Sequence, residues 1–328
     1  MPSIQEANER IQQDARLVQQ VLAESRRVVI GQDVLLERLI IALLCDGHVL
    51  IEGLPGLAKT LAVRTLAATL NAHFQRIQFT PDLLPADLIG TQIYNPRTGE
   101  FSPHPGPIFS NIILADEINR APAKVQSALL EAMEERQVTL GEVTRSLPAP
   151  FMVLATQNPI EQEGTYPLPE AQLDRFLLKI VVQYPSREAE REIIDQGISS
   201  PPAPPRAVMS PDDIVRVRQA VGGILLNDKI KDYVLDIVSV TRDPAAFGLK
   251  KLATLIDVGA SPRATLALVR TARAYAFLRG RAYVVPDDIK AIASDVLQHR
   301  LIPTFEAEAE NITPRQLIQQ ILNSVHVP

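Results

Sequence analysis

Five short apolar runs alternate with helical patterns in the first part of the chain, and this alternation most constrains the fold. The runs occupy residues 48–52, 74–79, 111–115, 151–155 and 176–182. Buried strands that alternate with helices favour a mainly parallel sheet with helices on both faces. We therefore expect an α/β core with a five-stranded parallel sheet.

The pattern changes after Pro185, because only helical periods follow from Ser186 onward. Serine or valine followed by proline marks three helix starts, since serine caps a helix and proline suits its first turn. These starts are at Ser210-Pro211, Ser261-Pro262 and Val285-Pro286, and Gly280 is a plausible stop for the helix before the last of them. The proline-rich residues 201–205 predict an extended connector. We expect an α/β domain over residues 1–185 and an all-helical domain over residues 186–328.

The composition is that of an ordinary globular protein, with 328 residues, 46% apolar residues, 22% charged residues and a net charge of -5. A net acidic chain lacks the electrostatic footprint of a nucleic-acid binder, although a local basic stripe can still exist. The single cysteine, Cys45, cannot form an internal disulfide and predicts a buried residue in a reducing compartment. The first thirty residues have no signal-peptide or membrane-span pattern, so we expect a cytoplasmic protein.

A glycine-containing loop follows the first apolar run and precedes a helical pattern. Strand, loop and helix are the context that a phosphate-binding loop requires. Backbone N–H groups and the helix start can surround phosphates, Lys59 can reach the β- and γ-phosphates of ATP, and Thr60 can ligate Mg²⁺. The predicted nucleotide-binding residues are Gly53, Leu54, Pro55, Gly56, Leu57, Ala58, Lys59, Thr60 and Leu61.

One residue of this loop departs from the pattern of a phosphate-binding loop. Ala58 stands where the pattern expects glycine, and its methyl group matters if the backbone there needs a positive φ. A chance glycine–proline turn ahead of a helix is the alternative interpretation.

Two acids, Asp116 and Glu117, end the third apolar run. This position places them at the carboxyl edge of a buried strand beside the phosphate loop. There Asp116 would hold Mg²⁺ through water, and Glu117 would orient or deprotonate the attacking water. Two ordinary surface acids at a solvated strand end are the alternative.

Three longer motifs resemble those of the MoxR family of AAA+ ATPases. They are the Walker B region DEINRAPAKVQSALLEAMEE at residues 116–135, ATQNP at residues 155–159 and GTYPLPEAQLDRF at residues 164–176. The likeness runs from about Val29 to the end of the chain. That family also carries alanine at the position of Ala58, so the resemblance implies a working phosphate loop.

The resemblance implies roles for further residues. Asn158 matches sensor 1, Arg175 matches the arginine finger that reaches the neighbouring subunit's nucleotide, and Arg263 matches sensor 2 on the helical lid. Gly31 and Gln32 resemble a motif beside the adenine. Alternatives remain: Asn158 could close a turn before Pro159, and Arg175 could pair with Asp174 at the surface. An arginine at a helix start opposes the helix dipole, which favours a nucleotide partner for Arg263.

Two hairpins are also expected. Residues 91–107 resemble the family's helix-2 insertion, and their turn residues suit a hairpin. Residues 137–144 resemble the hairpin ahead of sensor 1. In related ring ATPases such loops face the central channel. We therefore expect the two hairpins to contact the client, that is, the protein on which the ATPase acts. His73 and His104 lack metal-ligand spacing, so a bound transition metal is not expected.

The resemblance implies an ATPase that hydrolyses ATP with Mg²⁺ at the subunit boundaries of a homo-oligomer, with six subunits as the superfamily expectation. Such proteins drive chaperone-like remodelling or maturation of protein complexes, often beside a partner with a von Willebrand factor A domain. A DNA-linked AAA+ motor and a nucleotide-gated scaffold without turnover are the alternatives. The acidic charge disfavours the motor, and intact Glu117, Asn158 and Arg175 disfavour the scaffold.

Overall fold

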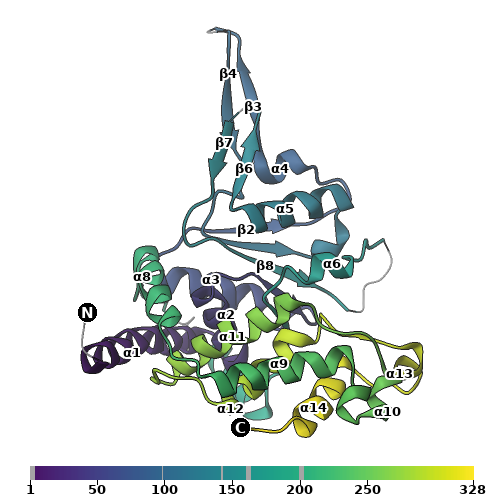
Figure 1. The fold of residues 1–328 in the computed structure, drawn as a ribbon. Helices are drawn as coiled ribbons and strands as arrows, with labels where there is room; N and C mark the ends of the chain where they lie inside the picture. Colours follow the sequence, from purple (N-terminus) through teal and green to yellow (C-terminus); the bar gives the residue numbers. More distant parts are fainter. Residues whose placement is uncertain (1–3, 98, 142, 160–163, 199–202) are drawn as a thin grey trace. The chain divides into compact units, whose positions relative to one another are not determined.

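The computed structural model describes residues 4–97, 99–141, 143–159, 164–198 and 203–328. Thr98 and Glu142 in the two predicted hairpins, and Pro201 and Pro202 in the predicted connector, lie outside these residues. The chain forms two compact units (Figure 1). One contains residues 20–175 and 180–216, and the other contains the chain up to Gln19 together with residues 176–179 and 217–328. The two units thus interleave along the chain, and the division at residue 185 stays a proposal about domains.

A five-stranded parallel sheet forms the centre of the α/β unit. The strand order is β2-β5-β8-β1-β9, and β2, β5, β8 and β1 pair in parallel. The bounds are β1 Val49–Glu52, β2 Phe74–Gln78, β5 Ile112–Asp116, β8 Met152–Gln157 and β9 Leu178–Val181. Every strand of this sheet overlaps one predicted apolar run. The interior strands β1, β5 and β8 are buried at all but their last residue, which requires continuous apolar sequence, whereas the edge strand β2 exposes Arg76 and Gln78. The sequence prediction of the fold class is confirmed.

Helices cover both faces of this sheet, with α5 on one side and α2 and α3 on the other (Figure 1). The bounds are α2 Asp33–Leu44, α3 Lys59–Thr69, α4 Pro85–Ile89, η1 Ile118–Arg120, α5 Ala123–Glu135, α6 Glu170–Leu173, α7 Arg187–Ile198 and α8 Pro211–Gly222. Helix α2 buries nine of its twelve residues, Cys45 just after it is also buried, and α7 buries none. The N-terminal helix α1 spans Ile4–Val28.

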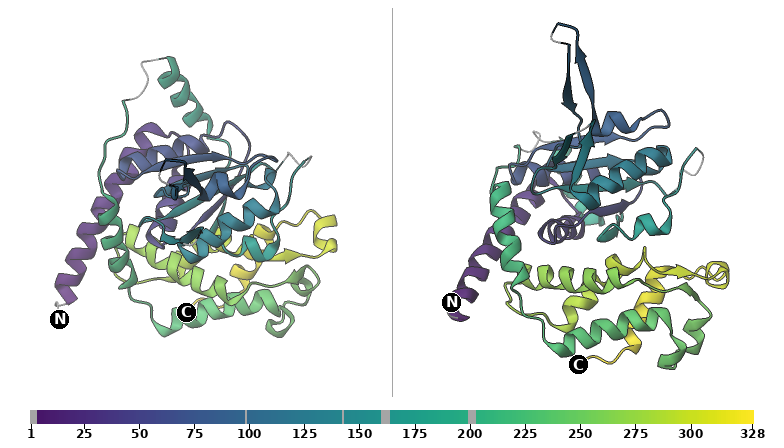
Figure 2. Two further views of the ribbon diagram at one scale, coloured as in Figure 1. Left: turned by 90° about the horizontal axis from the view of Figure 1, so that it is seen from above. Right: turned by 45° about the horizontal axis from the view of Figure 1, so that its top comes forward.

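Both predicted hairpins are present, and they extend from one side of the α/β unit (Figure 2). β3 (Gly90–Asn95) pairs with β4 (Glu100–Pro105) in antiparallel register, and β6 (Gln137–Leu140) pairs with β7 (Val143–Ser146). The two hairpins are in contact. The Gln92 side chain on β3 lies so close to Gly141, in the turn between β6 and β7, that a Cβ added at Gly141 would overlap it. The prediction of two hairpins is confirmed for their described residues.

The second unit is built mainly from helices. They are α9 Asp228–Arg242, η2 Ala245–Phe247, α10 Lys250–Ala253, α11 Pro262–Leu278, α12 Pro286–Leu297, α13 Phe305–Ala309 and α14 Pro314–Ser324. The three predicted helix starts are confirmed, and Ser261 caps α11 by accepting the backbone N–H of Arg263 at 3.1 Å. The sequence predicts only helices in this region, but the structure also contains a short antiparallel pair of strands, β10 (Ile256–Val258) and β11 (Ile302–Pro303). No helix in the described ranges is long and apolar enough to cross a membrane.

Candidate functional site

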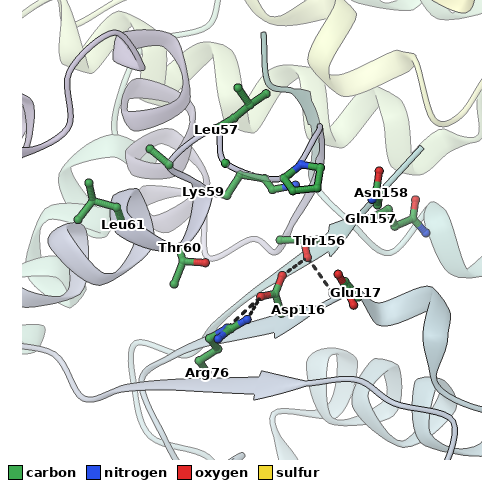
Figure 3. Close-up of a pocket in the computed structure, with 13 residues that line it drawn as sticks. Leu57, Lys59, Thr60, Leu61, Arg76, Asp116, Glu117, Thr156, Gln157 and Asn158 are labelled. Atoms are coloured by element: carbon green, nitrogen blue, oxygen red, sulfur yellow. Dashed lines mark hydrogen bonds and ion pairs between the residues drawn. The ribbon is translucent and has the colours of Figure 1, made fainter. Parts of the chain in front are cut away.

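A pocket of about 400 Å³ lies where β1, β5 and β8 end, at the carboxyl edge of the sheet (Figure 3). Its volume falls within the range of small-molecule sites. Side chains from the loop before α3, from the ends of β5 and β8, and from β2 converge there. The lining residues are Pro55, Gly56, Leu57, Ala58, Lys59, Thr60, Leu61, Arg76, Asp116, Glu117, Thr156, Gln157 and Asn158. The structure therefore brings the predicted loop, both acids and Asn158 together.

The loop reaches this edge through two residues with positive φ. Gly56 has φ 83°, and Ala58 has φ 58° and ψ 19°, which is left-handed. Ala58 immediately precedes α3, so the first N–H groups of that helix face the loop and lack partners within the helix. A left-handed residue with a Cβ costs about 1–2 kcal/mol relative to the right-handed form. The sequence-based concern about the Ala58 methyl group therefore applies to this backbone.

Lys59 folds back onto its own loop. Its Nζ donates a hydrogen bond to the backbone oxygen of Gly53. Burial lowers the pKa of Lys59, while the negative charges of Asp116 and Glu117 oppose that change. The ammonium group is thus held in the pocket beside two carboxylates.

Both carboxylate oxygens of Asp116 have partners. Thr156 Oγ1 donates to Asp116 Oδ1 at 2.5 Å, and Arg76 donates to Asp116 Oδ2 from Nε at 2.9 Å and from Nη2 at 2.6 Å. The Asp116 side chain is 15% exposed, whereas that of Arg76 is 50% exposed. One oxygen thus contacts a buried hydroxyl, and the other contacts a more exposed cation.

Glu117 has a left-handed backbone, with φ 58° and ψ 51°. Its N–H donates to Thr156 Oγ1 at 2.8 Å. Its Oε2 accepts a hydrogen bond from Gln78 Nε2 at 2.9 Å and lies 3.1 Å from Arg120 Nε. A non-glycine residue in this region costs of order 1–3 kcal/mol, and such strain clusters at functional sites.

Sequence reasoning missed Arg76, Gln78, Arg120 and Thr156. The polar residues Arg76 and Gln78 are two positions apart in an apolar run, so one signal was available: they share a face of β2. Nothing in the sequence indicated that β2 lies beside β5. The register pairs Gln78 with Asp116 and Arg76 with Leu114.

Arg175 lines a second depression of about 270 Å³ instead of the phosphate-loop pocket. Its Nη1 donates to the backbone oxygen of Leu130 at 3.1 Å and lies 3.1 Å from Glu134 Oε2. Ser127, Glu131, Glu135 and Gln172 also line this depression. The structure therefore does not bring Arg175 to the pocket of its own chain.

The remaining predicted residues lie apart from the pocket lining. Gly31 has φ 74°, and a Cβ there would come within 2.9 Å of Pro185 and Ala189. The buried Gln32 donates from Nε2 to the backbone oxygen of Gln183 at 3.2 Å. Arg263 is at the start of α11 in the helical unit. Gly53 and Leu54 connect β1 to the loop without lining the pocket, and the predicted roles of all these residues stay predictions.

The pocket fits a phosphate chain with a hard divalent cation. Backbone N–H groups and Lys59 suit phosphate oxygens, and the Thr60 hydroxyl with the Asp116 carboxylate suits Mg²⁺, which binds few protein oxygens and keeps several waters. No group of three or more His, Cys, Asp or Glu residues that could hold a metal ion occurs in the described part of the chain.

Comparisons with known proteins agree with this geometry. Residues 48–178 match the model of the ATPase family associated with various cellular activities (AAA), and residues 251–321 match the AAA lid domain. The chain is 48% identical to Chaperone MoxR1 of Mycobacterium tuberculosis, over 96% of this chain and 83% of that protein. It is 34% identical to Protein MoxR of Paracoccus denitrificans, over 92% and 93% respectively. The crystal structure of a protein described as a putative ATPase, from Cytophaga hutchinsonii, superposes on this chain with a TM-score of 0.93. The two sequences are 48% identical, and the match covers 99% of both chains.

Proposed function

The chain belongs to the MoxR family of AAA+ ATPases, and we propose that it hydrolyses ATP at the boundaries between subunits of a homo-oligomeric ring. One observation carries the proposal. Both acids at the end of β5 face the phosphate loop in one pocket, whereas Arg175 lines another depression of the same chain. An arginine that acts on ATP from there would act on a neighbouring subunit's pocket. Six subunits are the superfamily expectation.

Each residue of the pocket has a distinct task in this proposal. The loop N–H groups and Lys59 would bind the phosphates, Thr60 would ligate the magnesium ion, and Asp116 would hold that ion through water. Mg²⁺, when bound, neutralises charge on the phosphate oxygens. Glu117 accepts a proton from the attacking water or orients it, and the Asn158 amide positions that water. Gly31 and Gln32 are proposed to lie on the adenine side, and Arg263 is proposed to act as sensor 2.

Arg175 would stabilise the charge that develops on the transferred phosphate. An arginine supplied in trans accelerates phosphoryl transfer by about 10³- to 10⁵-fold in other systems. The ion pair with Glu134 is partly exposed on both sides, at 33% and 42%, so exchanging it for a phosphate contact costs little.

The test compares ATP hydrolysis per mole of protein across a range of protein concentrations. The samples are the parent, Arg175→Ala, Glu117→Gln and an equal mixture of the two variants. Arg187→Ala is the control, because Arg187 is exposed and lines neither depression. Activity that rises with concentration, falls in each variant and partly returns in the mixture supports a shared site. A concentration-independent rate that Arg175→Ala leaves unchanged would exclude it.

We further propose that the cycle drives chaperone-like remodelling or maturation of protein complexes, alongside a partner with a von Willebrand factor A domain. Support comes from the hairpins, where Ile93, Tyr94 and Phe101 are 49%, 52% and 64% exposed. The rings of Tyr94 and Phe101 lie 5.2 Å apart. Exposed apolar side chains on a projecting element suit transient contact with unfolded protein.

The proposed contact between the hairpins and unfolded protein can be tested separately. Carboxymethylated lactalbumin, an unfolded polypeptide, should stimulate ATP hydrolysis by the parent but not by a Tyr94→Ser, Phe101→Ser double variant with parental basal activity. Stimulation that persists in the double variant counts against the hairpins. DNA binding that weakens steeply with salt would instead favour the DNA-linked motor, and ATP binding without turnover would favour the scaffold.

A further inference from the structure

Strand β2 contributes two polar side chains to the acids at the end of β5. Arg76 and Gln78 are two positions apart, so their side chains share one face of the strand. Arg76 Nη2 donates to Gln78 Oε1 at 2.8 Å and to Asp116 Oδ2 at 2.6 Å. Gln78 Nε2 in turn donates to Glu117 Oε2 at 2.9 Å. A continuous chain of hydrogen bonds thus joins Arg76 to both acids.

The two partners of Asp116 differ in exposure. Thr156 is 1% exposed, so its hydroxyl is fixed on Oδ1 by the surrounding core. Arg76 reaches Oδ2 with a side chain that is half exposed, and it also lines the pocket (Figure 3). A half-exposed guanidinium can exchange its partner for water, whereas a buried hydroxyl cannot. Arg76 is therefore the exchangeable partner of the Asp116 carboxylate.

Arg76 and a divalent cation make competing demands on that carboxylate. A guanidinium that donates two hydrogen bonds to one carboxylate oxygen occupies both accepting directions of that oxygen and offsets part of the negative charge. A magnesium ion, or a water bound to it, needs the same negative charge and the same acceptor. Both cations cannot use Oδ2 at full strength at once.

We propose that Arg76 is a positioning residue that competes with Mg²⁺ for Asp116, and that loading of the metal requires Arg76 to move away from Oδ2. This inference rests on the proposed function of the pocket as an ATP and magnesium site. Departure of Arg76 also removes the donor to Gln78 Oε1, so metal loading alters the hydrogen-bond chain that holds Glu117. Arg76 thereby sets the magnesium concentration at which the metal site fills, but it does not bind the phosphates.

The experiment measures binding of a fluorescent ATP analogue to the full-length protein. Affinity is measured in EDTA, and the free Mg²⁺ concentration that half-saturates the additional binding is then determined by titration. The variants are Arg76→Gln, which removes the charge, and Arg76→Lys, which retains it. Arg26→Gln is the matched control, because Arg26 also pairs with an acid, Asp33, at 2.5 Å, is similarly exposed, and does not line the pocket.

Arg76→Gln should lower the half-saturating Mg²⁺ concentration by roughly fivefold, the upper range for a partly exposed ion pair, and leave affinity in EDTA unchanged. Arg76→Lys should fall between this variant and the parent, and Arg26→Gln should match the parent. An unchanged or higher magnesium requirement in Arg76→Gln overturns the inference. Weaker binding in EDTA also overturns it, because Arg76 would then be a phosphate ligand.

The same experiment distinguishes a wrong assignment of the ATP site from a wrong assignment of Arg76. A parent chain that shows no magnesium-dependent binding of the analogue removes the ATP site and the inference with it. A parent that binds normally, with an Arg76→Gln variant that titrates identically, removes only the role of Arg76. Thermal unfolding of each variant establishes that the measured proteins are folded.

Discussion

Thr156 on β8 donates a 2.5 Å hydrogen bond to Asp116 on β5, with Thr156 Oγ1 and Asp116 Oδ1 as the two atoms. The same hydroxyl oxygen accepts the backbone N–H of Glu117 at 2.8 Å. A single buried side chain therefore sets the orientation of the proposed metal ligand and of the backbone that carries the proposed base. Neighbouring parallel strands bring these groups together across 40 residues of sequence.

Thr156→Val tests this relationship, because valine keeps the volume and removes the hydroxyl. Asp116 Oδ1 and the Glu117 N–H would lose this partner, so the free energy of unfolding should fall by about 1–3 kcal/mol. Affinity for the ATP analogue with Mg²⁺ should also weaken. Thr156→Ser keeps the hydroxyl and is the control for urea unfolding and analogue binding. Equal stability and affinity in the valine variant would show that the hydroxyl positions neither acid.

Glu117→Gln separates binding from hydrolysis. Glutamine has nearly the same shape but is a far weaker base, so turnover should fall by about 10²- to 10⁴-fold while the ATP analogue still binds. Glu188→Gln, an exposed acid on α7, is the control. Steady-state phosphate release and analogue titration provide the two measurements, and parental turnover in Glu117→Gln would remove the proposed role of this residue.

Ala58→Gly should be neutral or stabilising, although glycine usually destabilises. Glycine releases the strain of φ 58° but adds about 0.4–1 kcal/mol of chain entropy to the unfolded state, so the two effects oppose each other. Ala68→Gly makes the same chemical change at an exposed position in the last turn of α3, where the backbone is right-handed and glycine should cost up to about 0.5–1 kcal/mol. Urea unfolding compares the variants, and a larger loss in Ala58→Gly than in Ala68→Gly would contradict this account.

Gly31→Ala should destabilise the protein by about 1–3 kcal/mol, because alanine meets both a positive φ and close neighbours. The added Cβ would lie 2.8 Å from Pro185 Cβ and 2.9 Å from Ala189 Cβ. Gly197→Ala in α7 is the matched control, since its Cβ would meet nothing within 4 Å and alanine favours helix. Thermal unfolding should therefore move in opposite directions for the two variants.

The buried His299 should make the folded protein less stable in mild acid. Burial, and next the positive charge of Arg300, hold its pKa well below 6.5. Its Nε2 hydrogen-bonds the backbone oxygen of Phe176 at 3.0 Å, so the folded protein contains neutral histidine that donates from Nε2. Since the unfolded chain binds a proton near pH 6.5 and the folded chain does not, stability is complete above that pH and falls as the pH decreases below it.

The measurement for His299 is the urea midpoint between pH 7.5 and pH 5. His299→Gln retains an N–H donor without titrating, so its midpoint should fall less over this range. His326→Gln, an exposed histidine near the C-terminus, is the control and should follow the parent. Identical slopes in the parent and in His299→Gln would show that this side chain does not cause the acid sensitivity.

The sequence alone predicted those features that depend on local pattern. The five apolar runs became the five strands. The signal is continuous in the interior strands β1, β5 and β8, which are buried on both faces, and weaker in the edge strand β2, which exposes Arg76 and Gln78. The helix starts at Pro211, Pro262 and Pro286 followed from residues that fix the first turn. The pair β10 and β11 was missed, because strands of three and two residues are too short to show a period.

The sequence was enough to predict a phosphate-binding loop, the pair of acids at a strand end and the membership of the family, because each of these signals is contiguous along the chain. The positions of β2 and β8 on either side of β5, and with them the contacts of Arg76, Gln78 and Thr156 with Asp116 and Glu117, became visible only in the folded domain. Strand order depends on the packing of the whole domain and on no single stretch of sequence. A side chain on a neighbouring strand leaves no mark in the residues next to the acid that it contacts.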